Sequence, residues 1–254
     1  MRFLKISTAF ILIFCFALSA SADCQMNWFF KSKGDNSRPE ILGGNAILKD
    51  SGALYLGPEG DKTVYLTFDA GYSNEYVEKT LDVLKKHNVT AAFFILPGII
   101  KNSKETVMRM IEDGHTICNH TTSHKNVARI NDLDSFRKEL NGIEEYYKNE
   151  TGKDMEKYFR PPEGAFSEKT LDFCKELGYI PVFWSFAYRD WDKNRQPDLE
   201  KSKAKILDNA HDGMVLLLHP TSETNALILD DVITELKARG YSFGTLDELK
   251  QKSP

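Results

Sequence analysis

Two histidines four residues apart, His120 and His124, are the first candidates for chemistry in this sequence. They lie in the stretch HTICNHTTSH, residues 115–124, just after a short apolar run that is typical of a strand. On a helical turn this spacing places both imidazoles on one face, about 6 Å apart at Cβ. Because two such nitrogens commonly bind one divalent metal, the pair predicts a metal site. The alternative is a pair of surface histidines on a loop.

Other chemically capable side chains also follow apolar runs. Asp69 follows TVYLTF, Arg160 follows KYF, Asp190 and Trp191 come shortly after IPVFWS, and His219 follows MVLLL. If these runs are parallel strands, their carboxyl ends gather at one rim, which is where parallel barrels carry their active sites. We therefore expect these residues to share one site with the two histidines.

The combination describes the hydrolysis of an amide or an ester. A metal on two histidines acts as a Lewis acid and acidifies bound water. Asp69, beside a glycine-containing turn, is suited to act as general base, and Arg160, stiffened by the two prolines after it, would keep Asp69 ionised. His219 is a candidate general acid, and Asp190 would raise its pKa.

Each of these residues also has a purely structural interpretation. Asp69 could be a helix N-cap or a turn residue, Arg160 a partner in a structural salt bridge, and His219 a satisfied core residue. The sequence contains no GxSxG elbow, no Walker loop and no GxGxxG after a strand, which argues against serine nucleophiles and nucleotide binding. The net charge of −4 and a pI near 5.9 give no sign of nucleic-acid binding.

The elements that must position these side chains alternate along the chain. Strands are expected at 63–68, 91–96, 115–119, 157–160, 180–185, 214–218 and 241–243, and helices at 75–87, 103–113, 133–150, 167–177, 198–210 and 224–239. Apolar strands alternating with helices indicate a parallel sheet covered on both sides. Seven such units predict an α/β barrel of about seven parallel strands, complete or incomplete. A doubly wound open sheet is the alternative.

The N-terminal region differs from the rest of the chain. Arg2 and Lys5 precede an apolar run at 6–18, and Ala20-Ser21-Ala22 resembles a cleavage site. Residues 1–22 are therefore expected to be a signal peptide of an exported protein, and retention as an N-terminal anchor is the alternative.

The remaining 232 of the 254 residues suit one large domain. Residues 23–60 are rich in Gly, Asn, Pro and Ser and are expected to be an irregular arm, with Trp28-Phe29-Phe30 as an apolar clasp. Residues 61–250 are expected to form the catalytic domain. Without the signal peptide, Cys24, Cys118 and Cys174 remain, which allows one disulfide or three free thiols.

Five short segments of the chain resemble the motifs of a known family. The segments TFDAG, NHTTSH, RPPEGAFS, FWSFAYRDW and LLLHP occur in the order of the five motifs of the polysaccharide deacetylase family, the NodB-like carbohydrate esterases of family 4. More narrowly, NWFFK, YLTFDAGY, FRPPEGAFSEKTL and VFWSFAYRDWDKNRQ resemble the delta-lactam-forming N-acetylmuramic acid deacetylases of spore-forming bacteria. The resemblance covers roughly residues 27–249.

The resemblance implies a deformed (β/α) barrel that removes acetyl groups from the glycan strands of peptidoglycan. In the narrower group the substrate is muramic acid of the spore cortex, after a muramoyl-peptide amidase has removed the peptide. The freed amine then closes onto the lactyl carboxyl group as a delta-lactam. A monomer that works outside the membrane is expected.

The family motifs also assign roles to individual residues. They place the base at Asp69, the metal ligands at His120 and His124, and the acid at His219. Arg160 then pairs with the base and Asp190 with the acid, and the residues expected to contact substrate are Trp191, Pro162, Glu163 and Arg189. Zinc fits two histidines plus water, and manganese, cobalt or nickel would serve as well.

Two departures from the family pattern keep other functions open. Ala70 stands where the family usually has an aspartate as third metal ligand, which predicts weaker metal binding. Glu163 stands where the lactam-forming relatives tend to carry a basic residue, and Arg189 is a candidate substitute. Glu163 motivates an alternative, a deacetylase of N-acetylglucosamine in peptidoglycan or chitin. Ala70 motivates another, a wall-binding protein with impaired catalysis.

Overall fold

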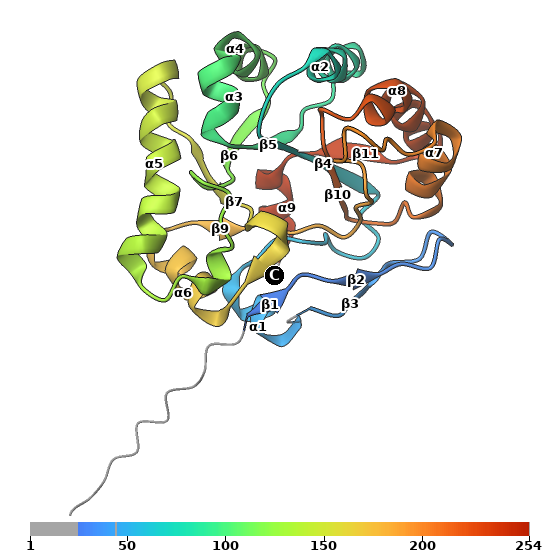
Figure 1. Ribbon diagram of the computed structural model, residues 1–254. Coiled ribbons are helices and arrows are strands. Elements are labelled where there is room, and N and C mark those ends of the chain that lie inside the picture. Colours follow the sequence, from blue (N-terminus) through green and yellow to red (C-terminus); the bar gives the residue numbers. More distant parts are fainter. Residues whose placement is uncertain (1–24, 44, 254) are drawn as a thin grey trace, which may run out of the picture.

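A curled sheet of parallel strands forms the centre of the molecule (Figure 1). The computed structural model describes residues 25–43 and 45–253. Within these residues the strand order is β10, β4, β5, β6, β7 and β9, with parallel neighbours throughout. The bounds are β4 Thr63–Ala70, β5 Ala92–Ile95, β6 Thr116–Asn119, β7 Glu156–Phe159, β9 Ile180–Pro181 and β10 Met214–Leu218. The short strand β11, Ser242–Gly244, pairs with the first residues of β4.

The sheet curls until its two ends meet through the segment that follows β9. β9 itself pairs with β7, and Val182 N just after it still donates to Phe159 O of β7 at 2.7 Å. Four residues further on, Phe186 forms a parallel bridge with Leu216 of β10, and Leu217 N donates to Phe186 O at 3.0 Å. The deformed (β/α) barrel is thus confirmed against the doubly wound sheet. The expected strand at 180–185 is wrong in extent, because the segment passes from one neighbour to the other and is a regular strand over Ile180–Pro181.

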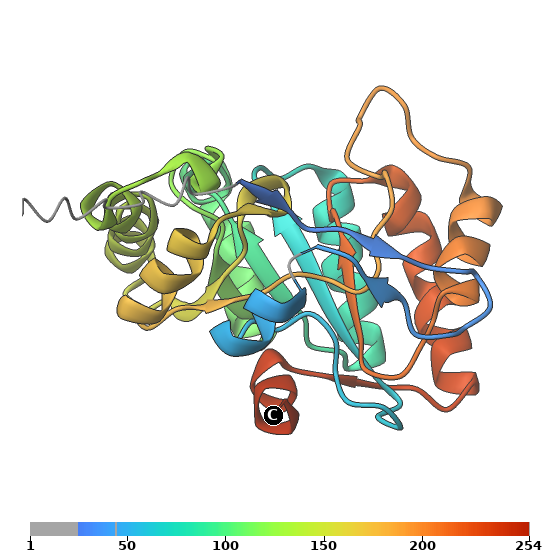
Figure 2. The same ribbon diagram turned by 90° about the horizontal axis from the view of Figure 1, so that it is seen from below.

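Helices cover the outside of the curled sheet (Figures 1 and 2). Their bounds are α2 Glu75–His87, α3 Pro97–Asn102, α4 Lys104–Glu112, α5 Leu133–Thr151, α6 Glu168–Glu176, α7 Leu199–Asp208 and α8 Glu223–Ala238. Most of their apolar stripes pack on the outward-facing strand residues in one large buried cluster, which includes Phe68, Phe93 and Leu229, whereas α6 and the start of α5 pack in separate smaller clusters. The six expected helices are confirmed to within a few residues, and α3 is an addition to them.

The alternate strand residues fill the interior of the barrel. Tyr65, Phe94 and Val215 pack there with Leu246 and Leu249 of the last helix, α9 (Leu246–Lys252). Because α9 follows β11, which pairs with the start of β4, it closes the end of the barrel where the strands begin. The opposite rim, formed by the carboxyl ends of the strands, is left for the site.

The N-terminal arm is more regular than its composition predicts. Its elements are β1 Met26–Asn27, which pairs antiparallel with β8 Ala165–Phe166, the hairpin of β2 Phe30–Lys31 with β3 Glu40–Ile41, and α1 Asn45–Ser51. The arm thus combines short regular elements with the irregular chain that its composition predicts. Strands of two residues are too short for alternation of apolar and polar side chains to reveal them in a sequence.

Trp28 is the anchor of this arm. Its ring stacks on Phe183 with centroids 4.8 Å apart, its Nε1 donates to Trp184 O at 2.9 Å, and its backbone N donates to Gly164 O at 2.8 Å. Phe29 is 59% exposed, so the expected clasp does not include its side chain. Trp28 thereby holds the arm beside the loop that follows Arg160.

Some expectations concern the ends of the chain and its cysteines. The expected signal peptide, residues 1–22, and Cys24 lie outside the described residues. None of the helices described is long and apolar enough to span a bilayer. Of the cysteines that the structure places, Cys118 and Cys174 are buried and free.

Candidate active site

Asp69 and Arg160 form a buried ion pair at the carboxyl end of β4. Asp69 Oδ1 accepts from Arg160 Nη1 at 2.8 Å, and the arginine side chain is fully buried. The guanidinium also donates to Thr67 Oγ1 at 2.8 Å and lies over the ring of Phe94, 4.1 Å from its centroid. Its remaining donors reach the carbonyl oxygen of Val182 and that of the next residue along the chain. Arg160 is thus fixed on every side and holds Asp69 in one position.

The same surroundings set the charge of Asp69. Burial alone raises the pKa of this carboxyl group, but the positive charges of Arg160, His120 and His219 outweigh it and hold the pKa below the usual 3.8. Asp69 is therefore ionised at neutral pH. Its side chain remains 12% exposed, so solvent reaches the carboxylate.

His120 and His124 lie on a loop directly after β6, and their rings are 5.0 Å apart between centroids. The expected helical turn was wrong. Thr121 and His124 both adopt left-handed backbone angles, with φ of 73° and 54°. The loop is built by side-chain bonds, because Asn119 Oδ1 accepts from Thr121 N and Thr121 Oγ1 accepts from His124 N, both at 2.9 Å. The i, i+4 spacing therefore brings the imidazoles together without a helix.

His120 presents its Nε2 to the site. Its Nδ1 lies 2.9 Å from the carbonyl oxygen of Arg160, and because a carbonyl can only accept, Nδ1 carries the proton and Nε2 the lone pair. Nε2 is 3.6 Å from Asp69 Oδ2. Burial lowers the pKa of His120 to about 4, so the ring is neutral at neutral pH, as a metal ligand must be.

His219 and Asp190 form the second polar pair of the rim. His219 Nδ1 and Asp190 Oδ1 are 2.8 Å apart, and Asp190 Oδ2 accepts from His219 N at 2.8 Å. Burial by itself lowers the pKa of His219, but the hydrogen bond and charge of Asp190, with the charge of Asp69, raise it above the usual 6.5. His219 is thus within electrostatic reach of Asp69, and the proton on Nδ1 leaves Nε2 for substrate.

The residues that hold Asp190 carry no recognisable signal in the sequence. Asn225, on the first turn of α8, donates from Nδ2 to Asp190 Oδ2 at 2.5 Å and to His219 O at 3.1 Å. Tyr188 in turn donates its hydroxyl proton to Asn225 Oδ1. Asp190 is 1% exposed, and this chain of bonds fixes the side from which it faces His219.

The expected substrate-contacting residues differ in placement. Trp191 is 56% exposed, with its ring 5.7 Å from that of His219, which suits stacking on a sugar. Pro162 is buried in the turn after Arg160, while Glu163 is exposed with φ of 58°. Arg189 is exposed and pairs with Asp192 at 3.2 Å, so its charge is already engaged.

The donor set fits a divalent cation on two histidines completed by water. Among the described residues, no group of three or more His, Cys, Asp and Glu side chains is arranged to hold a metal. Ala70 is buried in the apolar cluster under the helices and offers no ligand. A neutral His120 with a fixed tautomer and an adjacent His124 supply two nitrogen donors, as such a site requires.

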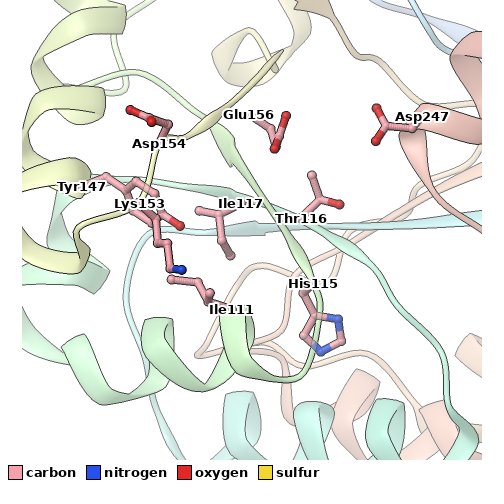
Figure 3. Close-up of a pocket in the computed structure, with 9 residues that line it drawn as sticks. All are labelled: Ile111, His115, Thr116, Ile117, Tyr147, Lys153, Asp154, Glu156 and Asp247. Atoms are coloured by element: carbon pink, nitrogen blue, oxygen red, sulfur yellow. The ribbon is translucent and has the colours of Figure 1, made fainter.

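Figure 3 shows a cavity of about 260 Å³ at the opposite end of the strands. It is lined by Thr116 and Glu156, the first residues of β6 and β7, and by Asp247 of α9. His115 also borders it, and its Nδ1 accepts from Ala91 N at 3.2 Å. None of the expected catalytic residues lines this cavity, so the chemistry belongs to the other rim.

The geometry defines a class of protein. An ionised carboxylate held by a buried arginine, two adjacent histidines and a histidine whose pKa is raised by an aspartate meet at the carboxyl rim of a parallel barrel. Base, electrophile site and acid are the requirements for splitting an amide with water. The class is therefore a barrel hydrolase of the deacetylase type.

Comparison with known proteins identifies the family. The family model "Polysaccharide deacetylase" matches residues 57–182. The peptidoglycan-N-acetylmuramic acid deacetylase PdaA of Bacillus subtilis is 42% identical over 226 residues, which are 88% of this chain and 85% of PdaA. This chain belongs to the polysaccharide deacetylase family, and it is a carbohydrate N-deacetylase.

A solved structure and one further relative agree. The solved structure of B. subtilis PdaA, a family 4 carbohydrate esterase, superposes with a TM-score of 0.85 at 40% identity and covers 91% of this chain and 98% of its own. A peptidoglycan-N-acetylglucosamine deacetylase of Bacillus cereus is 34% identical over 203 residues, 78% of this chain and 72% of the relative. The family therefore includes enzymes named for either peptidoglycan sugar.

Proposed function

We propose that this chain is a divalent-metal-dependent deacetylase of N-acetylmuramic acid in peptidoglycan, and that its product becomes the muramic delta-lactam of spore cortex. The observation that carries the proposal is the rim itself, where Asp69, the two histidines and the His219–Asp190 pair come together. The similarity to PdaA supports muramic acid as the sugar.

A divalent cation on His120 and His124 would supply a Lewis acid that polarises the acetyl carbonyl. Asp69 takes a proton from the water whose oxygen attacks the carbonyl carbon. His219 gives its Nε2 proton to the nitrogen as the C–N bond breaks, and acetate and a free amine result. Asp190 stabilises the cationic ring until that proton leaves.

The two pKa shifts suit these roles. Asp69 stays ionised well below neutral pH because Arg160 opposes the effect of burial. Asp190 faces His219 and raises its pKa, so the ring keeps its second proton to a higher pH than an ordinary histidine does. Base and acid therefore coexist in their reactive forms around neutral pH.

The lactam adds a requirement on the substrate. Its ring forms when the freed amine condenses with the lactyl carboxyl group and loses water, so the peptide must already be absent from that carboxyl. We therefore place this enzyme after a muramoyl-peptide amidase. It would act outside the membrane, in the cell wall or cortex, with residues 1–22 as its signal peptide or anchor.

Product analysis tests the proposal. Amidase-treated peptidoglycan is incubated with the zinc-loaded protein, and released acetate and digested glycan are measured by chromatography and mass spectrometry. Acetate together with lactam-bearing fragments is expected. Acetate release at any added metal would also exclude an impaired wall-binding protein.

A second candidate function is deacetylation of N-acetylglucosamine. It is favoured by Glu163, an exposed carboxylate next to the Arg160 turn that would repel a lactyl carboxylate. Free glucosamine units without any lactam in the same digest would support this candidate and overturn the first.

A further inference from the structure

The loop that carries His124 is bound to the middle of helix α5. Thr122 N and Thr122 Oγ1 both donate to the carbonyl oxygen of Glu139, at 2.8 Å and 2.9 Å. Asn119 Nδ2 donates to the carbonyl oxygen of Leu140 at 2.9 Å. The loop therefore rests on one turn of α5 through its backbone and short side chains.

The Glu139 side chain adds the bonds nearest to His124. Its carboxylate accepts from Ser123 N at 3.0 Å, and Ser123 Oγ lies 2.8 Å from both carboxylate oxygens. Lys125 Nζ approaches at 3.4 Å. Ser123 and Lys125 flank His124 in the chain, so one carboxylate holds both neighbours of this residue. Bonds to an ionised acceptor are stronger than neutral ones.

His124 needs such support because its own side chain is exposed. Its ring contacts the ring of His120, but packing holds an exposed side chain only in part, and its backbone has a left-handed φ of 54°. An exposed imidazole must lose rotamer freedom to bind a metal, and bonds that fix the backbone reduce this cost in advance. His120, by contrast, is buried and bonded to a carbonyl oxygen.

Gly142 shows how closely the loop and the helix approach. A Cβ atom at this position would lie 2.6 Å from Thr122 Oγ1. Glycine inside a helix costs about 1 kcal/mol relative to alanine. The position of Gly142 in α5 thus has a structural reason, namely room for the loop that Glu139 holds.

We propose that Glu139 is a positioning residue for the metal site, which holds His124 in the binding conformation through Ser123. The inference rests on the metal binding in the proposed function. Groups that orient a ligand through a second layer of hydrogen bonds typically change metal affinity by about 10- to 100-fold.

The test is the zinc affinity of the full-length protein, measured by competition with a chelator dye. Glu139→Ala is expected to weaken zinc binding at least about tenfold. Glu139→Gln is expected to lie between this variant and the native protein, because its amide oxygen still accepts from Ser123. Glu145→Ala, an exposed glutamate on the same helix, is the matched control with unchanged affinity.

A double-variant cycle separates positioning from general damage. In a His124→Ala background, Glu139→Ala should cause no further loss of zinc affinity, because the ligand it positions is already absent. Thermal unfolding of the zinc-free proteins checks that each variant folds. If Glu139→Ala does not fold, Ser123→Ala replaces it, with an expected loss of about threefold.

Three results would overturn the inference. The first is a zinc affinity of Glu139→Ala within twofold of the native value, and the second is an equal loss in the His124→Ala background. The third is a recovery of zinc affinity when Lys125→Ala is added to Glu139→Ala, because the effect would then come from the lysine that Glu139→Ala leaves unpaired. Absence of zinc binding by the native protein would instead overturn the metal dependence in the proposed function.

Discussion

Replacing Arg160 by methionine removes the buried cation that faces Asp69. The change deletes hydrogen bonds to Asp69, to Thr67 and to two backbone carbonyl groups, while the apolar replacement fills much of the same volume. Removing one partner of a buried ion pair costs about 3–5 kcal/mol. Asp69 is partly exposed and can take up a proton instead. We therefore expect the free energy of unfolding to fall by about 3 kcal/mol, the lower end of this range.

The loss of unfolding free energy in Arg160→Met should depend on pH, and its sign follows from the pKa of Asp69. In the native protein the pKa of Asp69 lies below 3.8, so its stabilising contribution is present above that pH and is lost as the pH falls through the folded-state value. Without Arg160, burial dominates and the pKa of Asp69 rises. The deficit in unfolding free energy is then largest near neutral pH and shrinks in acid, and the acid limb of kcat/KM moves to higher pH.

Urea unfolding of the metal-free protein between pH 3 and pH 8, together with a pH–rate profile, measures both effects. Arg109→Met is the control, because Arg109 pairs with three carboxylates, Glu78, Asp82 and Asp113, but its side chain is partly exposed to solvent. It should cost no more than about 1 kcal/mol and leave the profile unchanged. The reasoning would be refuted if Arg160→Met lowered the free energy of unfolding by less than about 1 kcal/mol and kept the native acid limb of the pH–rate profile.

Other predictions concern the acid and the arm. His219→Ala should lower kcat for acetate release by about 10²- to 10⁴-fold, and unchanged kcat would remove His219 as the acid. Asp190→Asn removes the charge that raises the pKa of His219, so the alkaline limb of the pH–rate profile should move to lower pH; a limb that stays in place would contradict this assignment. Gly164→Ala should be more destabilising in thermal unfolding than Gly152→Ala. Both have positive φ, but a Cβ at residue 164 would lie 2.9 Å from Cβ of Trp28 and one at residue 152 meets nothing within 4 Å. Equal losses would show that the contact with the arm is unimportant.

Much of the fold was predictable because its signals are local. Apolar runs such as Met214–Leu218 are buried throughout and mark strands, and amphipathic stretches such as Glu75–His87 mark helices. The rim was predictable because parallel strands end together, which placed Asp69 and His219 near each other without coordinates. The strand expected at 180–185 failed because pairing there switches between neighbours, which no run of side chains reveals.

The rest of the site depends on contacts that are distant in sequence. Asn225 is 35 residues from Asp190, and only the fold brings its amide to that carboxylate. The loop from His120 to His124 was misjudged as helical because the spacing suits a helix equally well. Its true shape depends on Asn119 and on Glu139 in α5, which lies 15 residues beyond His124.

The most direct test of the central claim is acetate release from peptide-free peptidoglycan by the native protein and by Asp69→Asn, both loaded with zinc. The asparagine oxygen can still accept the bond from Arg160, so the variant should fold. If this rim performs the hydrolysis, the native protein releases acetate and the variant does so about 10²- to 10⁴-fold more slowly. Equal rates for the two proteins would contradict the account.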